Sequence, residues 1–136
     1  MRVFAEETWG IFKEAVIGSS AAYEYKGGKI VRTDQMLGGL ALGAGKPEHI
    51  FAQTGRLPAF AGGNADVDIE MLESAAFALL VNHDDAQREY AYGPGTANPH
   101  SNFGTFTQAL HDEAIARGWV VFSIKDDWKR LFPFES

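Results

Sequence analysis

The chain has 136 residues, 46% of them hydrophobic and 22% charged, which is the length and composition of one ordinary globular domain. Its net charge of -6, with the Lys and Arg residues scattered singly, argues against a nucleic-acid-binding protein. There is no cysteine for disulfides or thiol chemistry, and no apolar run of the roughly 20 residues that a membrane-spanning helix needs, while nothing in the sequence indicates the compartment.

The first third of the chain mixes a helix, a strand and a hairpin. Residues 2–9 are predicted to form a helix that ends at Gly10 and has no N-cap residue before it, as expected if the sequence starts inside a helix. The apolar run at 15–18 predicts a short buried strand. Residues 22–33 alternate around Gly27-Gly28, which is the pattern of a β-hairpin.

Strands then alternate with helices to the end of the chain. We expect strands at 58–61, 77–81 and 119–124, and helices at 69–76, from the cap at 82–85 through 88–90, and at 105–117, with a loop at 93–104. This alternation predicts an α/β layered fold with a mostly parallel sheet, whose ligands bind beyond the carboxyl ends of the strands. Neither a repeat nor a domain boundary is evident, so residues 1–136 are expected to form one domain.

The turn after the strand at 58–61 carries several oxygen-bearing side chains, in the sequence Gly62-Gly-Asn-Ala-Asp-Val-Asp68. Magnesium prefers oxygen ligands and keeps several waters, so two or three side chains of one turn suffice together with a phosphate. Asn64, Asp66 and Asp68 are therefore candidate ligands. Such residues also serve as plain helix caps, but the glycines before them let a phosphate approach the backbone closely.

Lys46 follows a glycine-rich stretch at 38–45 and is expected near the start of a helix that ends at Gly55. A Walker A loop would need glycine and a Ser or Thr at the positions held by Leu40 and Pro47, so that interpretation fails. The remaining alternative is a solvated lysine on a linker. What favours a functional role is its position ahead of a helix, a strand and the acidic turn.

These two motifs together resemble the haloacid dehalogenase-like hydrolase superfamily. The stretch Gly63-Asn-Ala-Asp-Val-Asp-Ile-Glu-Met-Leu72 is similar to its fourth motif, and Gly45-Lys46-Pro47 stands where the phosphoserine-phosphatase-like branch has its third-motif lysine. Residues 79–90 and 125–129 look like the end of such a chain, so the resemblance covers nearly the whole sequence. It implies a Rossmann-like three-layer sandwich and a Mg2+-dependent phosphatase that acts on a small phosphorylated metabolite through an aspartyl phosphate.

Carried over to this sequence, the resemblance implies a role for each candidate residue. Lys46 would contact the phosphoryl group and the nucleophile, and Asp68 matches the second acid of the fourth motif. Asn64 stands where the family usually has its first acid, and Asp66 is a second source of the missing charge. The sequence leaves open which of Asn64 and Asp66 binds the metal.

The first two motifs of the superfamily have no counterpart. The single Asp-x-Asp, at Asp66 and Asp68, follows Gly-Gly-Asn-Ala instead of a strand and has Glu70 where Thr or Val belongs. The resemblance therefore implies an N-terminally truncated core domain that lacks the nucleophile strand and the second-motif strand and is inactive alone. Exposed strand edges would then favour self-association. The alternatives are a non-catalytic binding or assembly module that keeps a metal or phosphate site, and a fragment without an independent role.

Overall fold

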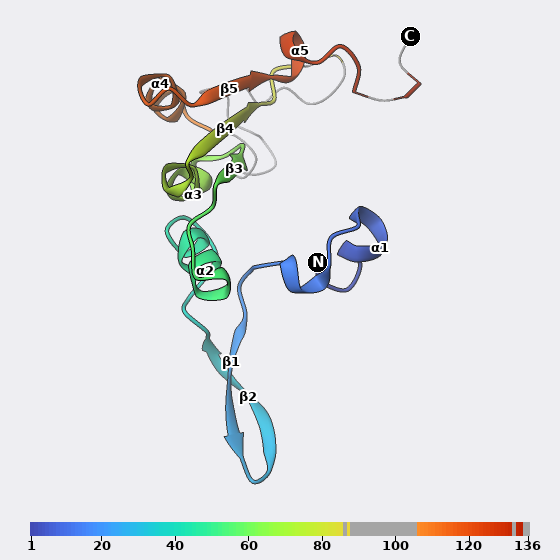
Figure 1. Cartoon of the computed structure of the whole chain (residues 1–136), viewed down its shortest axis with the longest axis vertical. Helices are drawn as coiled ribbons and strands as arrows, with labels where there is room; N and C mark the ends of the chain where they lie inside the picture. Colours follow the sequence, from blue (N-terminus) through green and yellow to red (C-terminus); the bar gives the residue numbers. More distant parts are fainter. Residues whose placement is uncertain (86, 88–105, 132, 135–136) are drawn as a thin grey trace. The chain divides into compact units, whose positions relative to one another are not determined.

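The computed structural model describes residues 1–85, 87, 106–131 and 133–134. The chain divides into two compact units, Met1–Leu57 and Pro58–Ser136, whose elements are labelled in Figure 1. The predicted helix through residues 88–90 and the predicted loop at 93–104 lie outside the described residues. Within the described part of the chain, no helix has the length and apolar character needed to cross a membrane.

The first unit begins with helix α1 (Ala5–Trp9), which confirms the predicted end at Gly10, where φ is 66°. The predicted start is wrong, because residues 2–4 form turns and the helix begins only at Ala5. The predicted strand at 15–18 is wrong. A 3-10 turn, η1 (Lys13–Ala15), reaches into this segment, and no strand of the described residues pairs with it. The carbonyl of Val16 instead accepts a hydrogen bond of 2.8 Å from Arg2 Nε. An apolar run forms a β-strand only where a neighbouring strand can pair with its backbone N–H and C=O groups.

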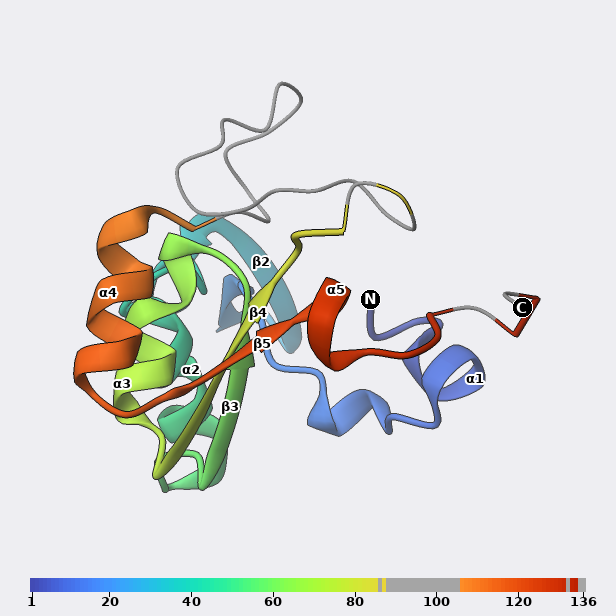
Figure 2. The same ribbon diagram turned by 90° about the horizontal axis from the view of Figure 1, so that it is seen from above.

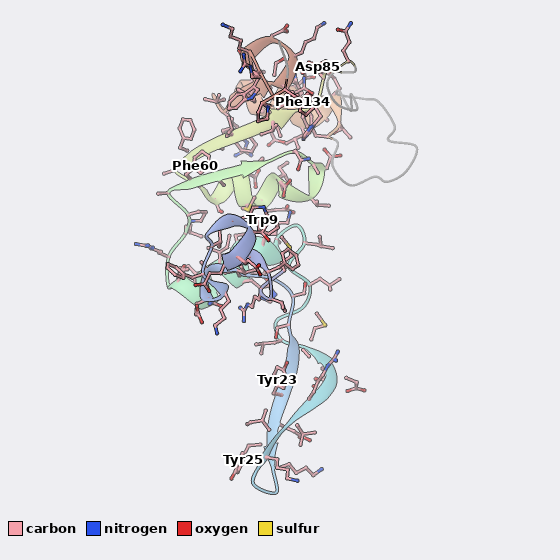
Figure 3. The ribbon with its side chains drawn as sticks, turned by 90° about the vertical axis from the view of Figure 1, so that its right-hand side faces the viewer. Trp9, Tyr23, Tyr25, Phe60, Asp85 and Phe134 are labelled. Atoms are coloured by element: carbon pink, nitrogen blue, oxygen red, sulfur yellow. The ribbon has the colours of Figure 1, made fainter. Side chains whose placement is uncertain are left out.

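The predicted hairpin is confirmed. Strand β1 (Ala21–Lys26) pairs antiparallel with β2 (Lys29–Met36), and the last pair before the turn is Lys26 with Lys29. Gly27 and Gly28 both have positive φ, 58° and 77°, which the tight two-residue turn requires. Figure 3 shows the tyrosine side chains of β1, Tyr23 and Tyr25, which are 58% and 76% exposed.

Helix α2 (Gly45–Thr54) closes the first unit and confirms the helix predicted around Lys46. It ends at Gly55, whose φ of 70° places it in the left-handed region typical of a helix C-cap.

The second unit is built on a three-stranded parallel sheet. Its strands are β3 (Phe60–Gly63), β4 (Phe77–Asn82) and β5 (Val120–Ser123), in the order β3-β4-β5. The connections contain the 3-10 turn η2 (Asp66–Asp68), α3 (Ile69–Ser74) and α4 (Gln108–Ala116), and α5 (Ile124–Asp127) follows the last strand. The predicted strands are confirmed to within two residues at each end. The unit is thus an α/β fold with helices beside a parallel sheet, an arrangement compatible with a Rossmann-like fold.

Helices α3 and α4 lie on the same side of the sheet, as Figure 2 shows, and the core of the unit lies between them and the strands. Successive side chains of a strand point to opposite faces, so Ala78 and Leu80 of β4 share the face that packs against the helices. The buried core consists of Ala61, Leu72, Ala78, Leu80, Phe106, Leu110 and Ala114.

The opposite face of the sheet carries large side chains that remain partly exposed. Phe60 and Phe77, neighbours on β3 and β4, stack with their ring centroids 5.7 Å apart and are 57% and 49% exposed. Further along this face, Phe122 meets Trp128 edge to face at 5.5 Å. Within the described residues β3 pairs with β4 alone, so its other edge is open.

Candidate functional site

The predicted metal-binding turn lies directly after β3. That strand ends at Gly63, and Asn64, Asp66 and Asp68 follow within five residues, at the carboxyl end of a strand in a parallel sheet. This is the edge at which α/β folds bind their ligands. The structure therefore brings the three predicted oxygen ligands together in one turn. Lys46, the fourth predicted site residue, belongs to the first unit.

Asp68 shapes this turn. It is only 6% exposed, and its Oδ2 accepts hydrogen bonds from the backbone N–H groups of Asn64 (3.0 Å) and Ala65 (3.1 Å). Its own N–H donates to the carbonyl of Ala65 at 2.9 Å. A buried carboxylate is costly unless charged or strongly polar donors surround it, and two backbone N–H groups meet that need. One carboxylate oxygen of Asp68 is thus committed to the backbone.

The glycine before the turn is required by the position of Asp68. A Cβ at residue 63 would stand 2.6 Å from the Cβ of Asp68 and 2.8 Å from its Cγ. Such distances do not occur between real side chains, so Gly63 provides the space in which the carboxylate folds back over the chain. The glycine of the motif therefore has a packing role that holds independently of any ligand.

Asp66 makes a different set of contacts. Its exposed carboxylate accepts two hydrogen bonds at Oδ1, from the backbone N–H of Thr107 (2.9 Å) and from Thr107 Oγ1 (3.1 Å). Thr107 is the N-cap of α4, and the same hydroxyl accepts from the N–H of Leu110 at 3.3 Å. Thr107 is a residue that the sequence reasoning missed. Threonine is a common N-cap, but nothing local indicates that its partner lies 41 residues earlier.

A second polar cluster joins the carboxyl ends of β4 and β5. Asp84 Oδ2 accepts hydrogen bonds from Ser123 Oγ (2.7 Å) and Asn82 Nδ2 (3.3 Å), and Asp84 Oδ1 accepts from the N–H of Lys125 (3.0 Å). Asn82 Oδ1 and Glu70 Oε2 are buried and find no hydrogen-bond partner among the described residues. The sequence suggested only a helix cap for Asp84, whereas the structure makes it the link between two strand ends.

Lys46 occupies the first turn of α2, where its backbone N–H donates to the carbonyl of Gly43 at 3.0 Å. A Cβ on Gly45 would collide with the carbonyl oxygen of Leu40, so the loop before the helix passes too close for any other residue. The glycine before Lys46 therefore fixes how the chain enters α2, and with it the backbone position of the lysine.

The first unit also contains a pocket of about 540 Å³, and Lys46 does not line it. Three of its polar lining residues link segments of the unit: Arg2 donates to the carbonyl of Val16, His49 Nε2 to that of Gly39, and Gln53 to that of Glu14.

The side-chain oxygens of the turn at 63–68 can be compared with the ligands that magnesium requires. In the described part of the chain, no group of three or more His, Cys, Asp or Glu side chains could enclose an ion. Magnesium does not require such a cage, because one or two carboxylates with waters and a substrate phosphate usually suffice. The amide oxygen of Asn64 and the carboxylates of Asp66 and Asp68 are hard oxygen donors of the right kind. The residues present therefore fit magnesium held jointly with a phosphate, and not a closed metal site.

Comparisons with protein-family models and with curated proteins produced no match to this chain. The family resemblance therefore rests on the two motifs and on the chemistry of the turn.

Proposed function

We propose that this chain carries the phosphate- and metal-binding half of a haloacid dehalogenase-like phosphatase site. The observation that carries the proposal is the turn at 63–68, where a buried Asp68 folds back over Gly63 and holds the backbone amides of Asn64 and Ala65. It stands at the carboxyl end of a parallel strand, where a phosphate would be expected to bind. The substrate class is a small phosphomonoester.

Each residue has a chemical task in this proposal. The family resemblance gives Lys46 the task of neutralising phosphoryl oxygens, and gives Asn64 and Asp68 the task of offering oxygens to the metal. Magnesium, when bound, would add Lewis-acid stabilisation of the charge that develops on the transferred group.

Neither aspartate of Asp66-Val-Asp68 is suited to be the nucleophile. Asp68 is buried and binds two backbone amides, while Asp66 is engaged with Thr107. We therefore propose that the nucleophilic aspartate belongs to a strand outside residues 1–136. Such a strand would pair at the open edge of β3. In this proposal the sheet is part of a core of the haloacid dehalogenase type that lacks the nucleophile strand and the second-motif strand.

The proposal is tested by hydrolysis of p-nitrophenyl phosphate with magnesium. The purified chain should release p-nitrophenol no faster than buffer, because neither aspartate of Asp66-Val-Asp68 is suited to be the nucleophile. A robust rate that disappears in Lys46→Ala would overturn the claim that the chain holds only half of the site. The matched control is Lys29→Ala, which removes an exposed lysine of β2.

A second candidate is a non-catalytic assembly module. The open edge of β3 and the exposed Phe60–Phe77 stack favour it, because an unpaired strand beside exposed aromatic rings promotes association. Size-exclusion chromatography with light scattering separates the candidates. Self-association through this edge predicts a dimer or larger species that Phe60→Ser returns to a monomer, whereas a monomeric wild-type chain argues against strand complementation between copies.

A further inference from the structure

We infer that Asp66 and Thr107 form a positioning pair that holds the turn at 63–68 against the start of α4, and that Asp66 is not itself a metal ligand. The inference rests on the proposed function, because it assigns a role within that same site. It also separates two residues, Asn64 and Asp66, that the sequence leaves equivalent.

The contacts of the turn divide into two groups. Asp68 bonds to the backbone of Asn64, so these two residues lie together at the end of β3. Asp66 bonds instead to Thr107, across 41 residues of sequence. In the described residues, the acids of the turn form no three-membered cluster that could hold an ion. Asp66 Oδ1 is thus engaged with Thr107 at the start of α4 and not with the Asn64–Asp68 contact.

The Asp66–Thr107 contact is well defined chemically. Thr107 Oγ1 accepts from the N–H of Leu110, so its single proton is free to point at Asp66 Oδ1. The backbone N–H of Thr107 adds a second bond to the same oxygen, which uses both acceptor positions of that oxygen.

Helix α4 also favours a negative charge at this end. It has nine residues, and the amino end of a helix carries a partial positive charge from its unpaired N–H groups. The carboxylate of Asp66 therefore stabilises the helix start, and the helix start holds the carboxylate. Loss of either partner should release one side of the turn.

Isosteric variants distinguish positioning from ligation. Asp66→Asn keeps an acceptor oxygen for Thr107 but removes the charge that a ligand would supply, while Thr107→Val removes the hydroxyl and leaves the carboxylate. Thr107→Ser is the conservative rescue, and Asp112→Asn, at an exposed position of α4, controls for the loss of one negative charge. The readout is Mn2+ binding to the full chain, from the free-ion electron paramagnetic resonance signal.

A positioning pair predicts that Thr107→Val weakens Mn2+ binding about tenfold or more, as removal of groups that orient metal ligands usually does. Thr107→Ser and Asp112→Asn should bind like the wild type, and Asp66→Asn, which keeps an acceptor for Thr107, should weaken binding less than Thr107→Val does. Weakening in Asp66→Asn that exceeds the weakening in Thr107→Val would overturn the inference and identify Asp66 as a ligand. Unchanged binding in Thr107→Val would also overturn the inference.

A failure of the proposed function gives a different result. A wild-type chain that binds no Mn2+ overturns the metal site and with it any positioning role. Weakened binding that follows only from unfolding is detected by urea denaturation of each variant. A Thr107→Val chain that is folded yet weakened supports the pair, whereas one whose loss of binding matches its unfolded fraction overturns it.

Discussion

Asp68 packs directly on Gly63, so closely that a Cβ at residue 63 would lie within 3 Å of its Cβ, Cγ and Oδ2. The shape of the turn thus depends both on the lack of a side chain at Gly63 and on the buried carboxylate of Asp68. The same carboxylate binds the N–H groups of Asn64 and Ala65. A change at residue 63 should therefore disturb the turn even when no ligand is present.

Gly63→Ala should destabilise the chain by about 1–3 kcal/mol, because the added methyl group overpacks against Asp68. Urea denaturation followed by circular dichroism measures this change. Gly62→Ala is the matched control, because its methyl group would meet only the ring of Phe60 at 3.8 Å, an ordinary contact. Equal stability of the two variants would contradict the packing described for Asp68.

Leu80→Ala should cost about 2–5 kcal/mol of unfolding free energy, because Leu80 is fully buried between the sheet and its helices. Ile115→Ala, at a position of α4 that is 58% exposed, should change stability by less than about 0.5 kcal/mol. Thermal and urea unfolding of the two variants provide the comparison. A small effect of Leu80→Ala would show that the core does not lie where the structure puts it.

The local elements of the fold could be predicted from the sequence because their signals are local. Gly27 and Gly28 specify the hairpin turn, Gly55 ends α2, and apolar runs mark the strands of the parallel sheet. The strand predicted at 15–18 failed because an apolar run does not reveal whether a partner strand exists.

The turn itself was also predictable, since Asn64, Asp66 and Asp68 are close in sequence. The contacts that each of these side chains makes were not predictable. The bond from Thr107 to Asp66 spans 41 residues and that from Ser123 to Asp84 spans 39, and neither leaves a trace in the local pattern. Long-range polar contacts are decided by how strands and helices pack.

Asp112, on the surface of α4, should titrate below its ordinary pKa. A hydrogen bond of 2.8 Å from Gln108 Nε2 is the main cause that lowers this pKa, and His111 adds to the effect. Because the folded-state pKa is lowered, the contribution of Asp112 to stability is present above its unfolded pKa, about 4, and is lost as the pH falls through the folded value.

Gln108→Ala should therefore raise the pKa of Asp112, as measured by carbon-13 NMR titration of its carboxyl group. His111→Ala should raise it less. The explanation fails if Asp112 titrates at the same pH in the wild type and in Gln108→Ala.

The central proposal is that the turn at 63–68 binds a phosphate together with magnesium, and the family resemblance adds Lys46 as a phosphate contact. Isothermal titration of the full chain with inorganic phosphate, with and without Mg2+, measures this most directly. The account predicts binding that requires Mg2+, that weakens at least about tenfold in Lys46→Ala and in Asn64→Ala, and that is unchanged in Lys29→Ala. Phosphate that fails to bind, or that binds equally well without Mg2+ and in Lys46→Ala, would contradict it.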